Sequence, residues 1–180
     1  MCSNRPEACQ RLFFALWPDA AVRQALAMAS RELLGRRIRQ VPAENLHLTL
    51  AFAGSVTAPV RACLEAAAGA VRAAPFELTV DHVGHWPRPR VLWAGPTHTP
   101  GNLWSLVEAL NRAFDACGLQ RETRPFQAHV TLARKIVRPP PLAALVPVTW
   151  SIGDFSLVES VTDARGARYR RLVTWTLEDG

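Results

Sequence analysis

The sequence predicts a single α+β domain built from two related lobes. Three observations support this: a length of 180 residues fits one compact unit or two small lobes that share a core, strand and helix signals alternate in the same order twice, and the motif His-x-Thr-Leu occurs once in each half. Hydrophobic residues make up 49% of the chain, enough apolar surface for a core, and the 20% that are charged favour solubility. This composition argues against global disorder.

Strand and helix signals alternate through the first half. Leucine and phenylalanine at 11–17 predict a strand that Pro18 ends. Asp19 is a suitable cap for the helix predicted over 20–34, and Gly35 supplies a C-terminal stop. The other elements expected in this half are a strand at 46–52, a helix at 59–73 and a strand at 76–83. The prolines within 86–89 indicate a crossover between the halves near the midpoint, and a short strand is expected after it at 91–94.

The second half repeats this order. A helix is expected over 101–117, with leucines and Phe114 on one apolar stripe and Gly118 at its end. The prolines at 139–141 predict a short helix or turn. The other strands expected here are at 127–133, 149–160 and 169–177. Residues 1–10 are polar and aperiodic and are expected to form a flexible tail, ahead of one two-lobed domain at 11–180.

The two motifs follow matched landmarks in the two halves. His47 lies 12 positions after Gly35, and His129 lies 11 positions after Gly118. Each interval contains a helix-ending glycine, a basic loop, a proline and then the His-x-Thr-Leu strand. The chain is therefore interpreted as a duplicated lobe.

Each motif presents one titratable group beside one hydroxyl. On a strand, His47 and Thr49 project from the same face about 7 Å apart, as do His129 and Thr131, while the residues between them point into the core. Two lobes related by an approximate two-fold axis would place both histidines in one pocket. Such a pocket could catalyse in-line displacement at phosphorus, since one imidazole can deprotonate the incoming oxygen and the other can protonate the departing one. The threonine hydroxyls could donate to the phosphoryl oxygens, and no metal is needed.

The sequence resembles the two-histidine phosphoesterases, specifically the bacterial and archaeal RNA 2′,3′-cyclic phosphodiesterases that are also called 2′-5′ RNA ligases. The likeness covers nearly the whole chain. It is carried by RLFFA at 11–15, ENLHLTLAF at 44–52, VLW at 91–93, RPF at 124–126, HVTLAR at 129–134 and Tyr169.

The resemblance implies a bilobal fold with two antiparallel sheets around a central cleft and helices on the outside. It also implies metal-independent opening of a terminal RNA 2′,3′-cyclic phosphate to a 2′-phosphate, with no cofactor. A 5′-hydroxyl in place of water would give reversible, ATP-independent 2′-5′ ligation. By the family pattern, His47 protonates the leaving 3′ oxygen and His129 activates water, although the sequence defines the pair better than the individual roles.

Two further site residues are carried over from the family. Phe14 corresponds to an aromatic platform near the nucleoside, where stacking would tolerate any base. Arg134, five places after the second histidine, corresponds to a phosphate-binding arginine. Strand alternation places Arg134 opposite to His129 unless a β-bulge turns it.

The net charge is compatible with a polyanionic partner such as RNA but does not identify one. Twenty-one basic residues against 15 acidic ones give a net charge of +6, and Lys135 is the one lysine, so the positive charge is almost entirely guanidinium. Arginine suits contact with phosphate, although an ordinary solvated surface explains the arginines equally well. The family resemblance implies RNA with 2′,3′-cyclic phosphate ends as the partner, such as tRNA fragments. The chain is expected to be cytoplasmic because the sequence shows neither a signal nor a membrane segment. It is also expected to be a monomer.

Cysteines and the remaining histidines receive no catalytic role. The four cysteines have neither C-x-x-C nor zinc spacing, and reduced thiols are expected. Asp81, His82 and His85 are set aside as metal ligands because neighbouring residues of a strand face opposite ways. Arginines at 36–39 and 165–171 could guide an RNA backbone or could simply be solvated.

Three other functions remain open from the sequence. The same chemistry could act on a small cyclic nucleotide, a cyclic ADP-ribose phosphate or 2′-5′ oligoadenylate. A non-catalytic module that binds RNA ends could retain the same cleft. A metallohydrolase is the third alternative, and a chelator would then abolish its activity.

Overall fold

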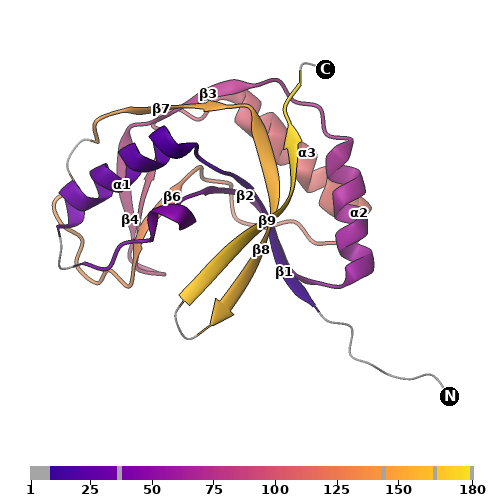
Figure 1. Ribbon diagram of the computed structural model, residues 1–180, viewed down its shortest axis with the longest axis horizontal. Coiled ribbons are helices and arrows are strands. Elements are labelled where there is room, and N and C mark those ends of the chain that lie inside the picture. The colour runs from indigo at the N-terminus through magenta and orange to yellow at the C-terminus, as the bar shows by residue number, and fades with distance from the viewer. Residues whose placement is uncertain (1–8, 36–37, 143–144, 164–165, 179–180) are drawn as a thin grey trace.

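The protein is described by a computed structural model that covers residues 9–35, 38–142, 145–163 and 166–178. A seven-stranded antiparallel sheet with strand order β4-β5-β6-β2-β1-β8-β9 forms the body, and a two-stranded sheet, β3-β7, accompanies it. The helices lie on the outside, with α2 and α3 together on one flank and α1 on the other (Figure 1). The predicted α+β class with two antiparallel sheets is confirmed.

The first half contains β1 (Gln10–Leu16), α1 (Ala20–Leu34), the short 3₁₀ helix η1 (Ala43–Asn45), β2 (Leu48–Val56), α2 (Ala58–Gly69), β3 (Phe76–Val80) and β4 (His82–Trp86). The second half contains β5 (Val91–Gly95), α3 (Gly101–Ala116), β6 (Val130–Arg134), β7 (Val148–Ile152), β8 (Asp154–Asp163) and β9 (Gly166–Thr176).

Local signals in the sequence fix the ends of the helices. The Asp19 carboxylate accepts a hydrogen bond from the Val22 amide at 2.8 Å, which caps α1. Gly35 ends α1 with φ at 63°, and Gly118 follows α3 with φ at 71°. Both conformations lie in the left-handed region that glycine adopts without strain, which is why helices commonly end there.

The halves exchange strands, and this exchange makes them one unit. Strand β4, from the first half, pairs with β5 of the second half. Conversely, β8 pairs with β1, and β7 pairs with β3. Neither half can therefore complete its sheet without the other.

The two motif strands are neighbours, joined at a single point. Strands β2 and β6 pair antiparallel at Leu48 and Val130, which directly follow the two motif histidines. On one side of this junction lies the lobe of β2, β1, β8 and β9, and on the other side the lobe of β6, β5 and β4. The approximate two-fold axis inferred from the sequence thus runs between Leu48 and Val130.

Several element predictions differ from the structure, and the motif strands begin one residue after each histidine, at Leu48 and Val130. The strand predicted at 76–83 is two strands, because the chain leaves the small sheet at Asp81, whose carboxylate accepts from the Thr97 amide at 2.7 Å, and enters the large sheet. The strand predicted at 149–160 is likewise divided at Gly153 into β7 and β8. Strand β1 begins at Gln10, inside the predicted tail, and the rest of that tail up to residue 8 lies outside the described residues. No helix forms over 139–142, and residues 143–144 are not described.

A disulfide corrects the expectation of reduced thiols. Cys63 of α2 and Cys117, which caps α3, are bonded, with their Cα atoms 5.8 Å apart. The two cysteines are 54 positions apart in the sequence, so only the packing of α2 on α3 brings them together.

Among the described residues, no helix has the length and apolar character needed to cross a membrane.

Candidate active site

A cavity of about 900 Å³ lies between the two lobes. All four motif side chains line it: His47 and Thr49 from one lobe, and His129 and Thr131 from the other. The structure therefore brings together the four residues that the repeat singled out. Continuing the antiparallel register from the Leu48–Val130 pair would set each histidine opposite the threonine of the other lobe.

The two imidazoles are anchored in the same way. The Nδ1 atom of His47 lies 2.7 Å from the carbonyl oxygen of Asn45, and Nδ1 of His129 lies 2.8 Å from the carbonyl oxygen of Gln127. A carbonyl oxygen only accepts, so each Nδ1 carries the proton and donates it. Each Nε2 is therefore unprotonated in the neutral ring and available to accept a proton. Each histidine thus uses the carbonyl two residues before it, which extends the internal symmetry to the hydrogen bonds.

Aromatic rings surround His47. Its imidazole stacks on Trp17 with centroids 5.2 Å apart and planes 5° apart, and the Tyr169 ring meets it edge-on at 4.8 Å. Phe13 lies 5.1 Å away. These contacts fix the plane of the imidazole and reduce its contact with water.

His129 has a smaller aromatic wall. Its ring meets Trp86 edge-on with centroids 4.6 Å apart, and Trp93 stands behind at 6.5 Å. Trp93 is buried, with 6% of its surface exposed. Trp93 in turn requires Gly84 on the neighbouring strand, where any Cβ atom would overlap the indole.

Burial lowers the basicity of both imidazoles. The pKa of His47 is lowered from 6.5 to about 4, mainly by loss of water around the ring and further by the positive charge of Arg134, despite the opposing hydrogen bond to Asn45. The pKa of His129 is lowered as well, first by burial and then by Arg134. Both rings are therefore neutral in the free protein near pH 7.

Matching β-bulges turn the residues that follow each motif. In β6, Trp93 pairs with Thr131 and Leu92 with Ala133, so Leu132 is the additional residue. In β2, Ala15 pairs with Thr49 and Phe14 with Ala51, so Leu50 occupies the same position. The additional residue reverses the alternation of side chains, which the motif sequence alone does not reveal.

The bulge brings Arg134 into the cavity. Arg134 is exposed and lines the same cavity as the histidines. Strand alternation alone would place it on the opposite face from His129, and the bulge at Leu132 reverses this. Its counterpart five residues after His47 is Phe52, which also lines the cavity and is 42% exposed. The Arg11 guanidinium lies 4.9 Å from the centroid of the Phe52 ring. The two lobes thus place a cation and an aromatic ring at equivalent positions.

The position expected for Phe14 is wrong. Phe14 is fully buried and packs against Phe114, Phe155 and Trp175 with ring centroids 6.0–6.1 Å apart. It belongs to the main core and does not line the cavity. Phe13 faces the cavity instead, because neighbouring residues on β1 point to opposite sides of the sheet.

Sequence reasoning left several cavity residues without a role. Tyr169, from β9, was part of the family likeness only, and Phe52 and Trp86 received no assignment. The signal for Phe52 was available in principle, since it stands at the same distance from His47 as Arg134 does from His129. Using that signal requires knowing that both strands carry a bulge.

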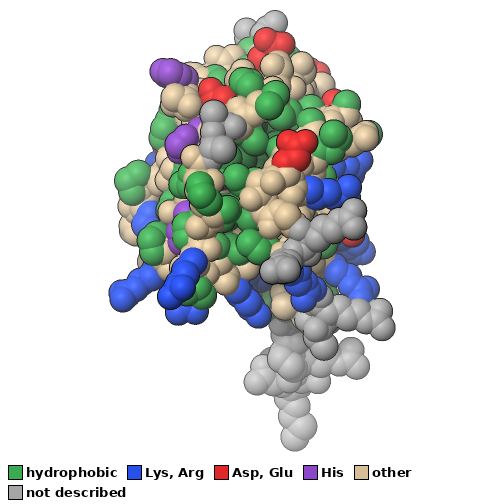
Figure 2. All heavy atoms as spheres, turned by 90° about the vertical axis from the view of Figure 1, so that its left-hand side faces the viewer, with side chains coloured by type: hydrophobic (Ala, Val, Ile, Leu, Met, Phe, Trp, Pro, Cys, Tyr) green, Lys and Arg blue, Asp and Glu red, His purple; other side chains and the backbone are tan. Residues whose placement is uncertain are grey.

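Basic side chains gather on one part of the molecular surface. In Figure 2, Lys and Arg side chains gather on the lower part of the face, toward which the β8–β9 hairpin projects in Figure 1, and most of the Asp and Glu side chains in view lie higher. Arg11, Arg88, Arg124 and Arg134 line the cavity. Of the arginine runs singled out in the sequence, Arg36, Arg37 and Arg165 lie outside the described residues.

His82 and His85, which are not expected to bind a metal, contact other groups. The His85 ring lies 3.0 Å from the carbonyl oxygen of Ile136 through Nε2, and the His82 ring packs against Trp93. Within the described ranges, no three His, Cys, Asp or Glu side chains form a group suited to a metal ion.

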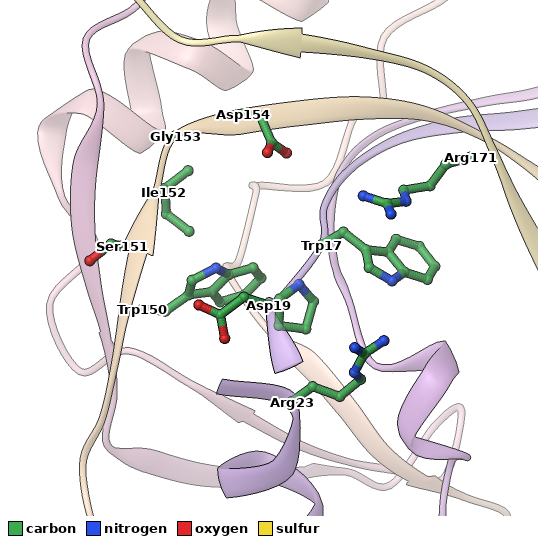
Figure 3. A pocket seen from close by; sticks show the side chains of 10 residues that line it. Trp17, Asp19, Arg23, Trp150, Ser151, Ile152, Gly153, Asp154 and Arg171 are labelled. Carbon is green, nitrogen blue, oxygen red and sulfur yellow. The ribbon is translucent and has the colours of Figure 1, made fainter. Parts of the chain in front are cut away.

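A second, smaller cavity of about 290 Å³ lies beside Trp17. Figure 3 shows Trp17 and Arg171 on one side of it and Ser151 and Ile152 across from them. Its charged lining residues balance, with Arg23 and Arg171 against Asp19 and Asp154. Trp17 lines this cavity and also stacks on His47, so its indole lies between the cavity and the imidazole.

Comparison with known proteins places this fold and site in a family. The sequence profile of the 2′-5′ RNA ligase superfamily matches residues 17–164. The chain is 38% identical to the RNA 2′,3′-cyclic phosphodiesterase of Escherichia coli strain K12, covering 93% of this chain and 97% of that protein. It is 31% identical to the RNA 2′,3′-cyclic phosphodiesterase of Archaeoglobus fulgidus, covering 90% and 97%.

Solved structures agree with the sequence comparison. The crystal structure of E. coli LigT in apo form matches with a TM-score of 0.87 at 33% identity, covering 94% of this chain and 98% of that chain. The same protein complexed with 3′-AMP matches with a TM-score of 0.87 at 35% identity and the same coverage. The chain belongs to the 2′-5′ RNA ligase superfamily, so the resemblance stated from its motifs is confirmed.

Proposed function

We propose that this protein is a metal-independent RNA 2′,3′-cyclic phosphodiesterase that opens terminal cyclic phosphates to 2′-phosphates. The observation that carries the proposal is the pair of equivalent imidazoles on one cavity, each with Nδ1 held by the carbonyl two residues earlier. The relatives that cover almost the whole chain carry the same activity in their names.

In the proposed reaction, a water oxygen attacks phosphorus as the bond from phosphorus to O3′ breaks. His129, through its neutral Nε2, takes the proton of the water, and His47 gives a proton to O3′. The product carries a 2′-phosphate and a free 3′-hydroxyl. The Thr49 and Thr131 hydroxyls donate to the two non-bridging oxygens, where negative charge increases in the transition state.

Arg134 supplies the positive charge for the phosphate in this proposal. Its position beside both imidazoles is supported by its effect in lowering both of their pKa values. The anionic substrate opposes that effect, since a phosphate near an imidazole favours the protonated form. Substrate binding therefore allows His47 to acquire the proton that it later donates.

The base of the terminal nucleotide stacks on Phe52 in this proposal, which replaces Phe14 in that role. Phe52 is exposed in the cavity and has Arg11 over its ring. A cavity of about 900 Å³ is near the upper end for small-ligand pockets, which favours RNA over a cyclic mononucleotide. The same site would accept a 5′-hydroxyl in place of water, giving 2′-5′ ligation.

The test uses an oligoribonucleotide that ends in a 2′,3′-cyclic phosphate, in the presence of a chelator. We expect the cyclic end to be converted to a 2′-phosphate. A phosphatase that removes only 3′-phosphates should leave this product unchanged, which distinguishes it from the 3′-phosphate isomer. Saturable binding without turnover would mean an RNA-end binding module instead. Loss of turnover in the chelator, restored by added divalent metal, would mean a metallohydrolase.

The proposal extends to the partner and the assembly. We expect tRNA fragments with cyclic ends to be substrates for a monomeric protein acting in the cytoplasm. Size-exclusion chromatography with light scattering checks the monomer, and fragments isolated from nuclease-treated tRNA check the substrate.

A further inference from the structure

The described part of the chain has two exposed large aromatic side chains: Phe52 lines the cavity, and Trp104 packs on a residue that lines it. Phe52, 42% exposed, lines it directly. Trp104, 46% exposed, lies just outside, where its ring meets Phe126 at 5.4 Å with the planes 78° apart. Phe126 itself lines the cavity. Aromatic rings in contact therefore lead from the cavity wall at Phe126 to the surface at Trp104.

Packing does not require a tryptophan at this position. Helix α3 buries its apolar stripe, which includes Leu103, Leu106 and Leu110, and Trp104 stands beside that stripe. A large part of the indole faces water, where a polar side chain would cost less. Exposed tryptophan next to a site for a polyanion is a common feature of surfaces that bind single-stranded nucleic acid.

We propose that Trp104 is a stacking site for a nucleotide upstream of the cyclic-phosphate end, which makes an RNA chain the substrate. This inference rests on the proposed function and adds to it a second binding position outside the cavity. The occupant is the substrate's own chain, because the indole is continuous with the cavity through Phe126.

The chain path and the charges fit this occupant. The loop before His129 supplies Arg124, Phe126 and Gln127 to the cavity wall, so an RNA strand that leaves the cavity along this loop can reach Trp104 by way of Phe126. Arg124 is 81% exposed at its side chain, and its Glu122 partner is half exposed, so this surface ion pair can open at little cost. A guanidinium freed in this way can contact a phosphate of the strand.

The experiment compares two substrates in the wild type and in three variants. The substrates are adenosine 2′,3′-cyclic phosphate and an oligoribonucleotide ending in the same nucleotide. Trp104→Ala is expected to lower kcat/KM for the oligonucleotide roughly tenfold and to leave the mononucleotide unchanged, which also shows that the variant is folded. Trp104→Phe should keep most of the activity, since a smaller ring still stacks. Met28→Ala, at a 51% exposed apolar residue of α1, is the matched control and should change neither substrate.

An abasic nucleotide placed in turn at the second, third and fourth positions from the end identifies the stacked base. At one of these positions, we expect the missing base to reduce kcat/KM in the wild type and to have no further effect in Trp104→Ala. Equal losses in both proteins at every position, or an oligonucleotide rate unaffected by Trp104→Ala, would overturn the inference. A wild-type protein that opens neither substrate would instead refute the proposed function.

Discussion

Leu48 pairs with Val130 across the junction of the two lobes, and each is the residue that directly follows a motif histidine. The symmetry axis of the fold therefore runs between the two motif strands, next to both histidines. Equivalent positions on the two strands become opposite walls of one cavity, including His47 with His129 and Phe52 with Arg134. In the proposed reaction, this symmetry puts the acid and the base on opposite sides of the substrate phosphorus, and the difference between Phe52 and Arg134 distinguishes the two walls.

Replacing either histidine is expected to abolish most of the activity. Alanine at His47 or His129 should each lower kcat for cyclic-phosphate opening by about 100- to 10,000-fold, because each removes one proton transfer. The double variant should be far less impaired than the product of the two single losses, since the pair acts as a unit. Single-turnover kinetics with an RNA substrate measure this. A single variant within a factor of three of wild type would contradict the assignment.

The pH dependence follows from the two lowered pKa values. The base must be neutral, so activity rises with pH through its pKa, and the acid must be protonated, so activity falls through its pKa. Because burial lowers both pKa values below 6.5 in the free enzyme, kcat/KM should be bell-shaped with its maximum on the acidic side.

The profile of kcat should lie at higher pH than that of kcat/KM. It reports the substrate complex, in which the phosphate charge raises both pKa values. Initial rates from pH 4 to 9 at low and saturating substrate separate the two profiles. Coincident maxima would mean that no phosphate charge reaches the imidazoles.

Arg134 should affect both binding and titration. Its removal in Arg134→Ala should lower kcat/KM about 10- to 100-fold, the usual effect of losing a charge-assisted hydrogen bond. It should also shift the kcat/KM profile to higher pH, because the charge of Arg134 lowers the pKa of both histidines. Arg138→Ala, at an exposed arginine that does not line the cavity, is the control and should leave rate and profile unchanged.

Gly84 should be intolerant of any side chain. A methyl group there would overlap the indole of Trp93, which supports the wall of His129. Gly84→Ala should destabilise the protein by about 1–3 kcal/mol, the range for overpacked cores. Gly101→Ala, at a position with open space around the added atom, should be nearly neutral. Urea denaturation of the two variants makes the comparison, and equal stabilities would contradict the packing described for Trp93.

The disulfide should stabilise the fold without taking part in catalysis. Closing a loop of 54 residues restricts the unfolded chain and is worth about 4 kcal/mol. The Cys63→Ser, Cys117→Ser double variant should therefore melt at lower temperature and keep its kcat at 25 °C. Unchanged melting after reduction would show that the bond does not form in solution.

Much of the site could be predicted from the sequence because the strand period is simple. The spacing in His47-x-Thr49 and His129-x-Thr131 fixes which side chains share a face, and the repeat of the motif indicates that the two strands meet. The helix ends at Asp19 and Gly35 were equally direct, because capping depends on neighbouring residues alone.

The remaining features depend on contacts between distant segments. The face on which Phe14 lies depends on how β1 pairs with its neighbours, and the bulges at Leu50 and Leu132 depend on strand pairing. The Cys63–Cys117 bond depends on the packing of two helices. The exchange of strands between the halves is likewise a property of the assembled sheet, which local patterns do not encode.

The most direct test of the account is a titration of both imidazoles by NMR, with and without a nucleoside 2′-monophosphate. If the two rings face one phosphorus atom, the Cε1 resonances of His47 and His129 should both shift on binding, and both pKa values should rise from their lowered values. A response from one histidine alone, with the other titrating as in the free protein, would contradict it.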